Sequence, residues 1–344
     1  MDTRIDDTPW GLVIVGNKNN NTESEGIMKK IKTVALIGLG AIGAYFADSI
    51  LPVLGDNLRV IAGGERKKRL AEEGLIVNGK QEFYNVTAPD EDTGFADLII
   101  ITTKITGLRQ ALEEVRLQVG LDTLILAPLN GVESEDITAS VYGWDKVLYS
   151  LMRVSSVKDG NRVTFDPKTS HVEFGEKIND ENDLSERVAC IREFFDSVGI
   201  KNIIRPDMEL AIWEKYVCNV SENQVSALMK IPFGAWGAYE DANAMRLMVA
   251  DEVINIARKK GIMIDIDYAK NHLEFLNKLP YDNKPSTLQD ILAGKKTEVD
   301  MFAGTVMRLG QEAGVPTPLN EFLFHAIKLM ENMNGEGRFK AVSF

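Results

Sequence analysis

Residues 32–51 read KTVALIGLGAIGAYFADSIL, and this stretch decides the fold of the chain. A run of apolar residues leads into a glycine turn, and a helical pattern leads out of it. In the pattern G-x-G-x-x-G, Gly38 permits a tight turn, Gly40 lets the backbone approach a pyrophosphate, and Gly43 lets the helix pack on the strand. The start of the helix offers free N–H groups to phosphates. We therefore predict that a dinucleotide contacts the whole turn, namely Gly38, Leu39, Gly40, Ala41, Ile42 and Gly43. The alternative is a tight strand–helix turn that binds no dinucleotide.

Apolar strand patterns alternate with helical patterns beyond this turn, for example at residues 96–104 and 122–131. Such alternation predicts a Rossmann-like, doubly wound α/β sheet, which we assign to residues 28–205. Within it, residues 74–90 are typical of a hairpin that turns at Asn78-Gly79. The pattern becomes helical afterwards, so we predict an all-helical substrate and catalytic domain over residues 206–344. Residues 1–27 lack the basic start of a secretory signal, and we expect them to form a disordered leader.

The bulk composition excludes several classes of function. A formal net charge of −12 and a pI near 4.9 argue against a nucleic-acid binder, which would need a basic face. No apolar run is long enough to span a membrane, so we expect no membrane association. Cys190 and Cys218 show no CxxC spacing, which favours a reducing, cytoplasmic location. The three histidines, His171, His272 and His325, are scattered, and we predict no metal site.

The residues after the second predicted strand bear on the choice of dinucleotide. An NAD site usually carries an acid there, whereas this chain reads IAGGERKKR over residues 61–69. The first acid is Glu65, and four cationic residues follow it. We predict NADP (NADPH) as the cofactor, with Arg66 as the contact to its 2′-phosphate. The alternative is a solvated helix start whose basic residues bind nothing.

The stretch WEKYVCNVSENQVSAL, residues 213–228, places three polar side chains in one row of an otherwise apolar helix. Lys215, Asn219 and Asn223 stand at i, i+4 and i+8, and such residues share one face. This row is consistent with a substrate-facing strip along a cleft. In the competing interpretation, Lys215 pairs with Glu222 or reaches out to water.

Four stretches in order, GLGAIG, NGVESE, WEKYVCNVSENQVSA and STLQDILAGKKTEVD, resemble the ketopantoate reductase (2-dehydropantoate 2-reductase) family. The resemblance runs from about Lys32 to the last helices. It implies a dinucleotide-binding domain, a helical domain and an active site in the cleft between them. Its implied site residues are Lys215 as general acid, Glu298 as the acid that engages substrate, Asn219 and Asn223 as substrate-holding amides, Ser286 as a carboxylate contact, Asn130 where nicotinamide and substrate meet, and Lys104 near the cofactor.

The reaction that this resemblance implies also makes chemical sense. Reduction of a 2-keto acid adds hydride to the carbonyl carbon, and the developing alkoxide needs a proton. A lysine can supply it if burial lowers its pKa from about 10.4 toward the working pH. We therefore expect NADPH-dependent reduction of ketopantoate to pantoate, a step of pantothenate biosynthesis, with a small 2-keto acid as the partner molecule.

Alternatives stay open for the substrate and for single residues. Leu129 replaces the family's usual glutamine, so another small 2-keto acid is an alternative substrate, and a non-catalytic NADP sensor is an alternative function. Ser286 is also placed to cap a helix, and Glu298 also fits an exposed charged patch. Trp236 and Phe302 are expected in the core. A homodimer formed through the helical domain is left open, because no sequence feature shows it.

Overall fold

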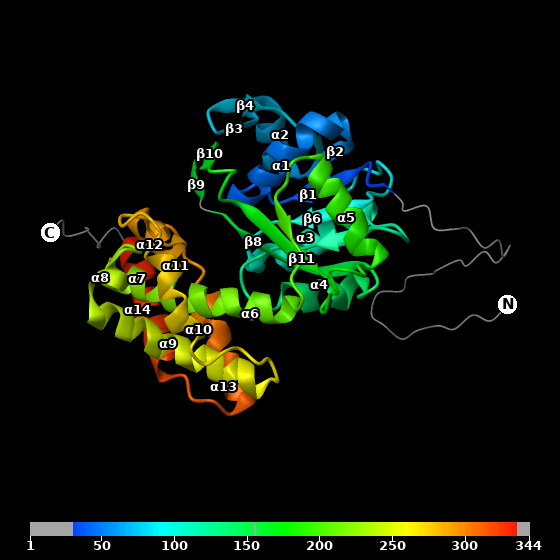
Figure 1. The fold of residues 1–344 in the computed structure, drawn as a ribbon. Coiled ribbons are helices and arrows are strands. Elements are labelled where there is room, and N and C mark those ends of the chain that lie inside the picture. The colour runs from blue at the N-terminus through cyan, green and yellow to red at the C-terminus, as the bar shows by residue number, and fades with distance from the viewer. Residues whose placement is uncertain (1–29, 155, 336–344) are drawn as a thin grey trace.

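The computed structural model describes residues 30–154 and 156–335 (Figure 1). The predicted leader at residues 1–27 lies outside the described residues. The strands are β1 (Val34–Ile37), β2 (Leu58–Ile61), β3 (Leu75–Val77), β4 (Lys80–Glu82), β5 (Asn85–Thr87), β6 (Leu98–Ile101), β7 (Leu124–Leu126), β8 (Val147–Arg153), β9 (Ser156–Asp159), β10 (Arg162–Phe165), β11 (His171–Gly175) and β12 (Asn202–Ile203).

The helices of the first part of the chain are α1 (Ala41–Leu54), α2 (Gly64–Glu73), α3 (Leu108–Glu114), α4 (Ser134–Tyr142) and α5 (Glu186–Ser197), with short 3-10 turns η1 (Gly55–Asn57), η2 (Ile105–Gly107) and η3 (Arg116–Gln118). Those of the second part are α6 (Met208–Cys218), the π-helix η4 (Asn219–Asn223), α7 (Gln224–Met229), α8 (Ala235–Ala238), α9 (Glu240–Lys259), α10 (Tyr268–Asn271), α11 (Leu273–Leu276), α12 (Ser286–Leu292), the π-helix η5 (Asp300–Gly304), α13 (Thr305–Ala313) and α14 (Pro318–Gly335).

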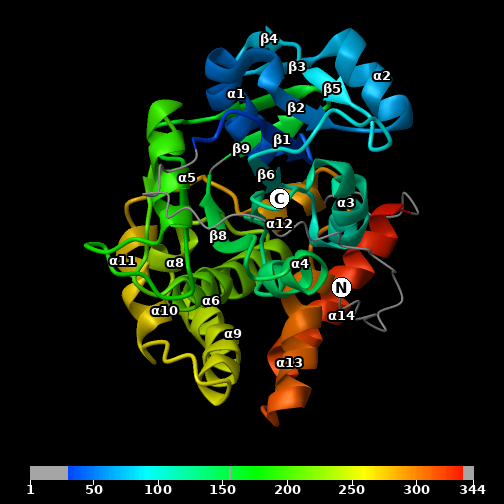
Figure 2. The ribbon, with the colours of Figure 1, turned by 90° about the vertical axis from the view of Figure 1, so that its right-hand side faces the viewer.

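The main sheet has eight strands in the order β12-β11-β8-β7-β6-β1-β2-β5. β1 pairs in parallel with both β2 and β6, with Val34 opposite Leu58 and Leu98, so the carboxyl ends of these strands share one edge. Both faces of β1 are buried, as expected for a parallel sheet covered on two sides. One apolar cluster joins the sheet to α1 and α5, and a second joins it to α3 and α4, which lie on the opposite side in Figure 2. The Rossmann-like prediction is confirmed.

A second, four-stranded sheet, in the order β4-β3-β10-β9, lies beside α1 and α2 (Figure 1). Its β3–β4 hairpin turns at Asn78 (φ 47°) and Gly79 (φ 87°), which confirms the predicted turn. Positive φ at both positions is what a tight two-residue hairpin needs. β10 then adds in parallel to β3, and β9 pairs antiparallel with β10. A segment far along the chain is thereby held over the first helix.

The described residues from Met208 onward form helices and no strand, which confirms the all-helical second part. Its apolar core includes Trp236 and Phe302, which are 1% and 0% exposed and lie in the core as predicted. The long helices α9, α13 and α14 pack against one another below the sheet (Figure 1). Among the described residues, no helix is both long and apolar enough to cross a membrane.

Candidate active site

The glycine turn joins β1 to α1 at the carboxyl edge of the sheet, and each glycine has a separate geometric role. Gly38 has φ of +98°, and a Cβ there would lie 2.6 Å from the backbone of Thr102. A Cβ on Gly43 would lie 2.4 Å from the Gly38 carbonyl oxygen, so close helix–strand packing requires glycine. At Gly40 the nearest atom would be 3.7 Å away, so the missing side chain leaves room rather than relieving a clash. Gly40 therefore leaves space beside the turn, and its contact with a dinucleotide stays a prediction.

Two of the four cations after β2 are engaged in ion pairs. Lys67 pairs with Glu91, and Lys68 pairs with Glu65 at 2.8 Å. Arg66 and Arg69, in the same helix α2, form no ion pair with any residue that the structure describes. Arg66 is exposed in the first turn of α2 and is thus free to contact an anion beyond the end of β2.

The structure brings together three residues that the sequence predicts for the catalytic centre. Lys215 Nζ, on α6, donates a hydrogen bond to Asn130 Oδ1 at 3.1 Å. Asn130 follows β7, and its Nδ2 donates to Glu298 Oε2 at 3.1 Å. Because Asn130 follows a strand of the sheet while Lys215 and Glu298 come from the helical part, this chain of contacts joins the two parts.

Lys215 sits in surroundings that favour its neutral form. Burial is the largest cause that lowers its pKa, and the Arg153 guanidinium lowers it further, to about 8. The carboxylates of Glu173, Glu298 and Glu135 oppose the shift. The competing pairing with Glu222 is not seen: Glu222 lies 3.6 Å from Arg246 instead.

The remaining predicted substrate contacts form a second row. Asn223 Nδ2 donates to Asn219 Oδ1 at 3.5 Å, and Ser286 Oγ donates to Asn223 Oδ1 at 3.5 Å. Asn219 and Asn223 do not lie on a regular α-helix, because residues 219–223 form a π-helix, a feature often found at functional sites. The interpretation of Ser286 as a helix cap is wrong: Pro285 holds that position, and no side chain caps α12.

The lysine expected near the cofactor contacts the helical part. Lys104 lies three residues beyond the end of β6, and its Nζ is 3.6 Å from Asp290 Oδ2 on α12. Its side chain is 55% exposed, so it also faces solvent at the edge of the sheet.

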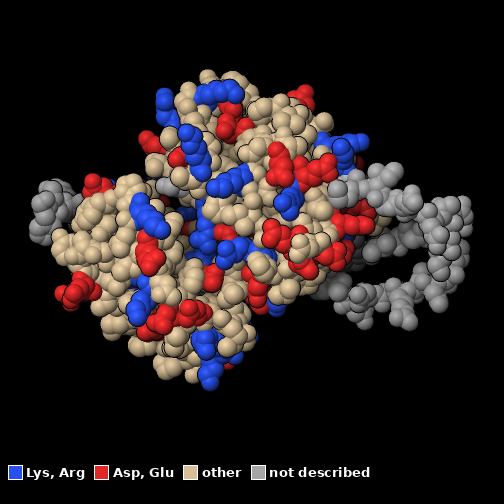
Figure 3. Space-filling view, in the orientation of Figure 1, with Lys and Arg blue, Asp and Glu red and all other residues tan. Residues whose placement is uncertain are grey.

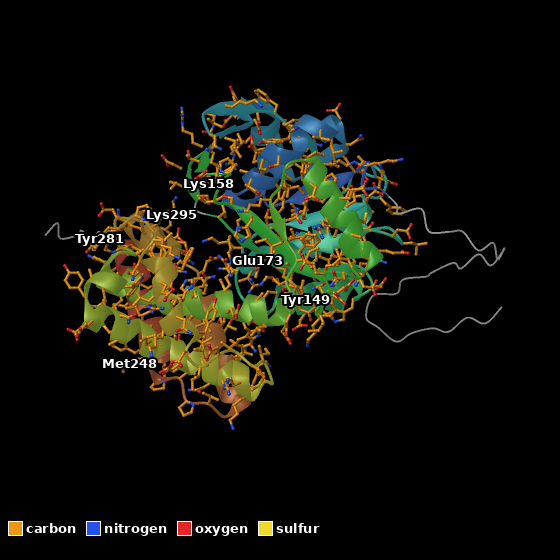
Figure 4. All side chains as sticks on the ribbon, in the orientation of Figure 1. Tyr149, Lys158, Glu173, Met248, Tyr281 and Lys295 are labelled. Carbon is orange, nitrogen blue, oxygen red and sulfur yellow. The ribbon has the colours of Figure 1, made fainter. Side chains whose placement is uncertain are left out.

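Sequence reasoning missed an ion pair between Arg153, at the end of β8, and Glu173, in the middle of β11. Arg153 Nε donates to Glu173 Oε1 at 2.5 Å, and Glu173 lies between the two parts of the molecule in Figure 4. Burial alone would raise the pKa of Glu173, but the hydrogen bond from His171 and the charges of Arg153 and Arg205 hold it at about 2. The available signal was Arg153, a cation within an apolar strand pattern. Its partner could not be identified without the register of β8 with β11.

One cluster bears on the expectation that no metal binds. Candidate ligand atoms of Cys218, Glu222 and His272 lie within 4.8 Å of one another inside the helical part. Arg246, which is fully buried, already places its guanidinium 3.6 Å from Glu222. Burial raises the pKa of the Cys218 thiol and raises that of Glu222 to about 7. A bound cation would have to displace or tolerate Arg246, so we assign no metal to this cluster.

Two family models match most of the chain. The model described as "Ketopantoate reductase PanE/ApbA" matches residues 34–178, and "Ketopantoate reductase PanE/ApbA C terminal" matches residues 207–331. The chain belongs to the ketopantoate reductase family. The curated relatives of this family member include "Uncharacterized oxidoreductase YkpB" of Bacillus subtilis strain 168, which is 24% identical over 86% of this chain and 98% of its own length. They also include a 2-dehydropantoate 2-reductase of Aquifex aeolicus strain VF5, which is 26% identical over 87% of this chain and 97% of its own length.

Solved structures share the ketopantoate reductase fold. A D-mandelate dehydrogenase in ternary complex with NADH and anilino(oxo)acetate aligns with a TM-score of 0.78 at 23% identity, covering 88% of this chain and 99% of its own. A dimeric ketopantoate reductase from Staphylococcus aureus aligns with a TM-score of 0.68 at 19% identity, covering 88% and 100%. Membership of the family makes the chain an oxidoreductase of the group that uses a nicotinamide cofactor and a small-molecule substrate.

Proposed function

We propose that this protein reduces a small 2-keto acid with NADPH, and that ketopantoate is its substrate and pantoate its product. The observation that carries the proposal is the contact chain Lys215–Asn130–Glu298, which joins the carboxyl edge of the sheet to the helical part. Active sites of open α/β sheets lie at that edge. The glycine turn, at the same edge, would hold the dinucleotide.

In this proposal Lys215 is the general acid. When bound, the nicotinamide supplies a hydride to the C2 carbonyl carbon, and the Lys215 ammonium donates its proton to the carbonyl oxygen. A pKa of about 8 suits this role, because the group is protonated at neutral pH and still yields its proton readily. Asn130 orients the ammonium through its carbonyl oxygen, and Glu298 orients Asn130 in turn.

The substrate would lie along the polar row on the helical side of the cleft. Asn219 and Asn223 offer amide groups without competing for the proton, and Ser286 offers a hydroxyl to the substrate carboxylate. Arg66 supports the choice of NADPH, since it is exposed at the start of α2 without an ion-pair partner among the described residues.

A different 2-keto acid is the second candidate substrate. Leu129 stands where the family usually carries glutamine, so the position next to Asn130 has no polar side chain. Leu129 is 4% exposed. A more apolar substrate would suit that change. One structural neighbour acts, by its name, on mandelate, so the keto acid that corresponds to mandelate belongs in any substrate panel.

The test is the decay of NADPH absorbance with ketopantoate, run beside NADH and beside a panel of 2-keto acids of similar and larger size. Rapid decay with NADPH and ketopantoate is the expected result. Decay only with another keto acid would refute ketopantoate but keep the roles of Lys215 and Glu298. Tight NADPH binding with no oxidation across the panel would refute the enzyme and favour a cofactor sensor.

A further inference from the structure

Four cationic side chains from three separate elements converge beside the glycine turn. Arg66 and Arg69 come from α2, Lys158 comes from β9 of the small sheet, and Lys295 follows α12 in the helical part. Figure 4 shows Lys158 and Lys295 near each other where the two parts of the molecule meet, and Figure 3 shows Lys and Arg gathered in that region. We call these four residues the cation cluster.

Lys158 is partly buried and is held in this position by a hydrogen bond. Its Nζ donates a hydrogen bond to the carbonyl oxygen of Leu39, within the glycine turn, at 3.2 Å. Along β9 the neighbouring Val157 is 59% exposed, while Lys158 is half-buried and points to the opposite side, toward α1. Because side chains alternate along a strand, the pairing of β9 with β10 fixes this direction.

The charges around Lys158 are unbalanced. Burial lowers the pKa of Lys158, and Arg66, Arg69 and Lys295 each lower it further, with no acidic side chain of the described residues acting in the other direction. The two remaining cations of α2 are already paired with glutamates. Like charges held this close repel, and an anion among them would remove that repulsion.

The cation cluster also joins the two parts of the molecule. Lys295 Nζ lies 3.5 Å from the backbone oxygen of Lys158, and beside it Lys104 lies 3.6 Å from Asp290. Burial raises the pKa of Asp290, and the charges of Lys104 and Lys295 both act on Asp290 to lower it. An anion bound between Lys158 and Lys295 would therefore contact both sides of the cleft.

We propose that Lys158 and Lys295 bind the 2′-phosphate of NADP(H) together with Arg66 and Arg69, so that this phosphate ties the helical part to the nucleotide-binding part. This inference rests on the proposed use of NADP(H). In a Rossmann site the N–H groups at the start of the first helix, here α1, bind the pyrophosphate. The adenosine ribose lies beyond the end of the second strand, here β2, next to α2. β2 ends at Ile61 and is followed by Ala62, Gly63 and Gly64, so the charge for a 2′-phosphate must come from other elements.

The experiment measures binding of two adenosine nucleotides by calorimetry: adenosine 2′,5′-bisphosphate, which carries the 2′-phosphate, and 5′-AMP, which lacks it. Lys158→Met and Lys295→Met remove the charge and keep the length of the side chain. Lys296→Met, the exposed neighbour of Lys295, and Lys168→Met, exposed in the β10–β11 loop, are the matched controls. Lys158→Arg keeps the charge and guards against a packing effect at the half-buried site.

We expect Lys158→Met and Lys295→Met each to weaken binding of the bisphosphate about tenfold and binding of 5′-AMP less than about twofold. The control variants and Lys158→Arg should bind both nucleotides about as tightly as the wild-type protein does. Equal weakening of both nucleotides would place the lysines at the 5′-phosphate and overturn the assignment, as would no weakening. Lys295 is exposed, so its variant tests the proposal even if Lys158→Met misfolds. If the variants show this pattern while the wild-type protein reduces no keto acid, the proposed reaction is refuted and the phosphate site is retained.

Discussion

Replacing Lys215 with alanine tests the proposed chemistry most directly. The side chain is the group placed to donate a proton, and its hydrogen bond to Asn130 Oδ1 at 3.1 Å orients it. A positioned general acid is worth roughly 10²–10⁴-fold in rate, so we expect kcat to fall by about 10³-fold. Cofactor binding should change little, because the glycine turn and the cation cluster do not include Lys215.

The pH dependence follows from the position of the pKa. The pKa of Lys215 is lowered from 10.5 to about 8, so the ammonium is fully present below that pH and is lost above it. Reduction of the keto acid should therefore be constant up to about pH 8 and then fall about tenfold per unit. Oxidation of the hydroxy acid needs the neutral amine and should rise over the same range. The variant Arg153→Met removes the second-largest cause of the shift and should move both limbs to higher pH.

The assay is NADPH absorbance at saturating cofactor from pH 6 to 10, in both directions, with Lys177→Ala as the control. Lys177 is a surface lysine paired with Glu209 at 2.8 Å and lies outside the proposed site. A Lys215→Ala enzyme within about threefold of wild type would refute the acid role. A wild-type reduction rate that stays level to pH 9.5 would show that a different group supplies the proton.

Four further variants separate binding, chemistry and folding. Glu298→Gln should lower kcat/KM about tenfold or more. It should also move the falling limb of the pH profile to lower pH, because the Glu298 carboxylate favours the charged form of Lys215. A pH–rate series measures both effects. Ser286→Ala should raise KM for the keto acid about tenfold at nearly constant kcat, and its melting temperature should stay within about 2 °C because Ser286 caps no helix. Gly43→Ala should destabilise the fold by about 2–4 kcal/mol, since its Cβ would lie 2.4 Å from a backbone oxygen. Gly40→Ala, with 3.7 Å of clearance, should melt normally yet bind NADPH at least tenfold more weakly; calorimetry beside thermal melts distinguishes the two.

The parts of the fold that local sequence specifies were predictable. The turn after β1 follows from its glycines, of which Gly38 and Gly43 are required sterically. The hairpin at Asn78-Gly79 follows from two residues that tolerate positive φ. The alternation of buried strands with helices follows from periodicity, since a strand covered on both faces is apolar throughout. These features depend on residues within one or two elements, so no tertiary information was needed.

The centre of the site depended on contacts that spacing cannot show. Lys215 and Asn130 are 85 positions apart, and Asn130 and Glu298 are 168 apart. Only the family resemblance named these three together. The π-helix at residues 219–223 was not predictable either, because its sequence fits a regular α-helix. Arg153 was missed since its partner Glu173 is set by strand register, with Arg153 opposite His171.

The chain is negatively charged overall, whereas the cation cluster beside its glycine turn is positively charged. A net charge of −12 gives the surface a negative field that disfavours polyanions such as nucleic acid. Inside the cleft, the ammonium of Lys104 and the guanidinium of Arg153 each meet an acid supplied from another element, Asp290 or Glu173. Lys158 meets none among the groups that act on its pKa. Cations with local acid partners are stabilised without a ligand, whereas an unbalanced one gains most from a bound phosphate. The distribution of partners, rather than the number of basic residues, therefore indicates where an anion should bind most strongly, and it identifies the surroundings of Lys158 as that place.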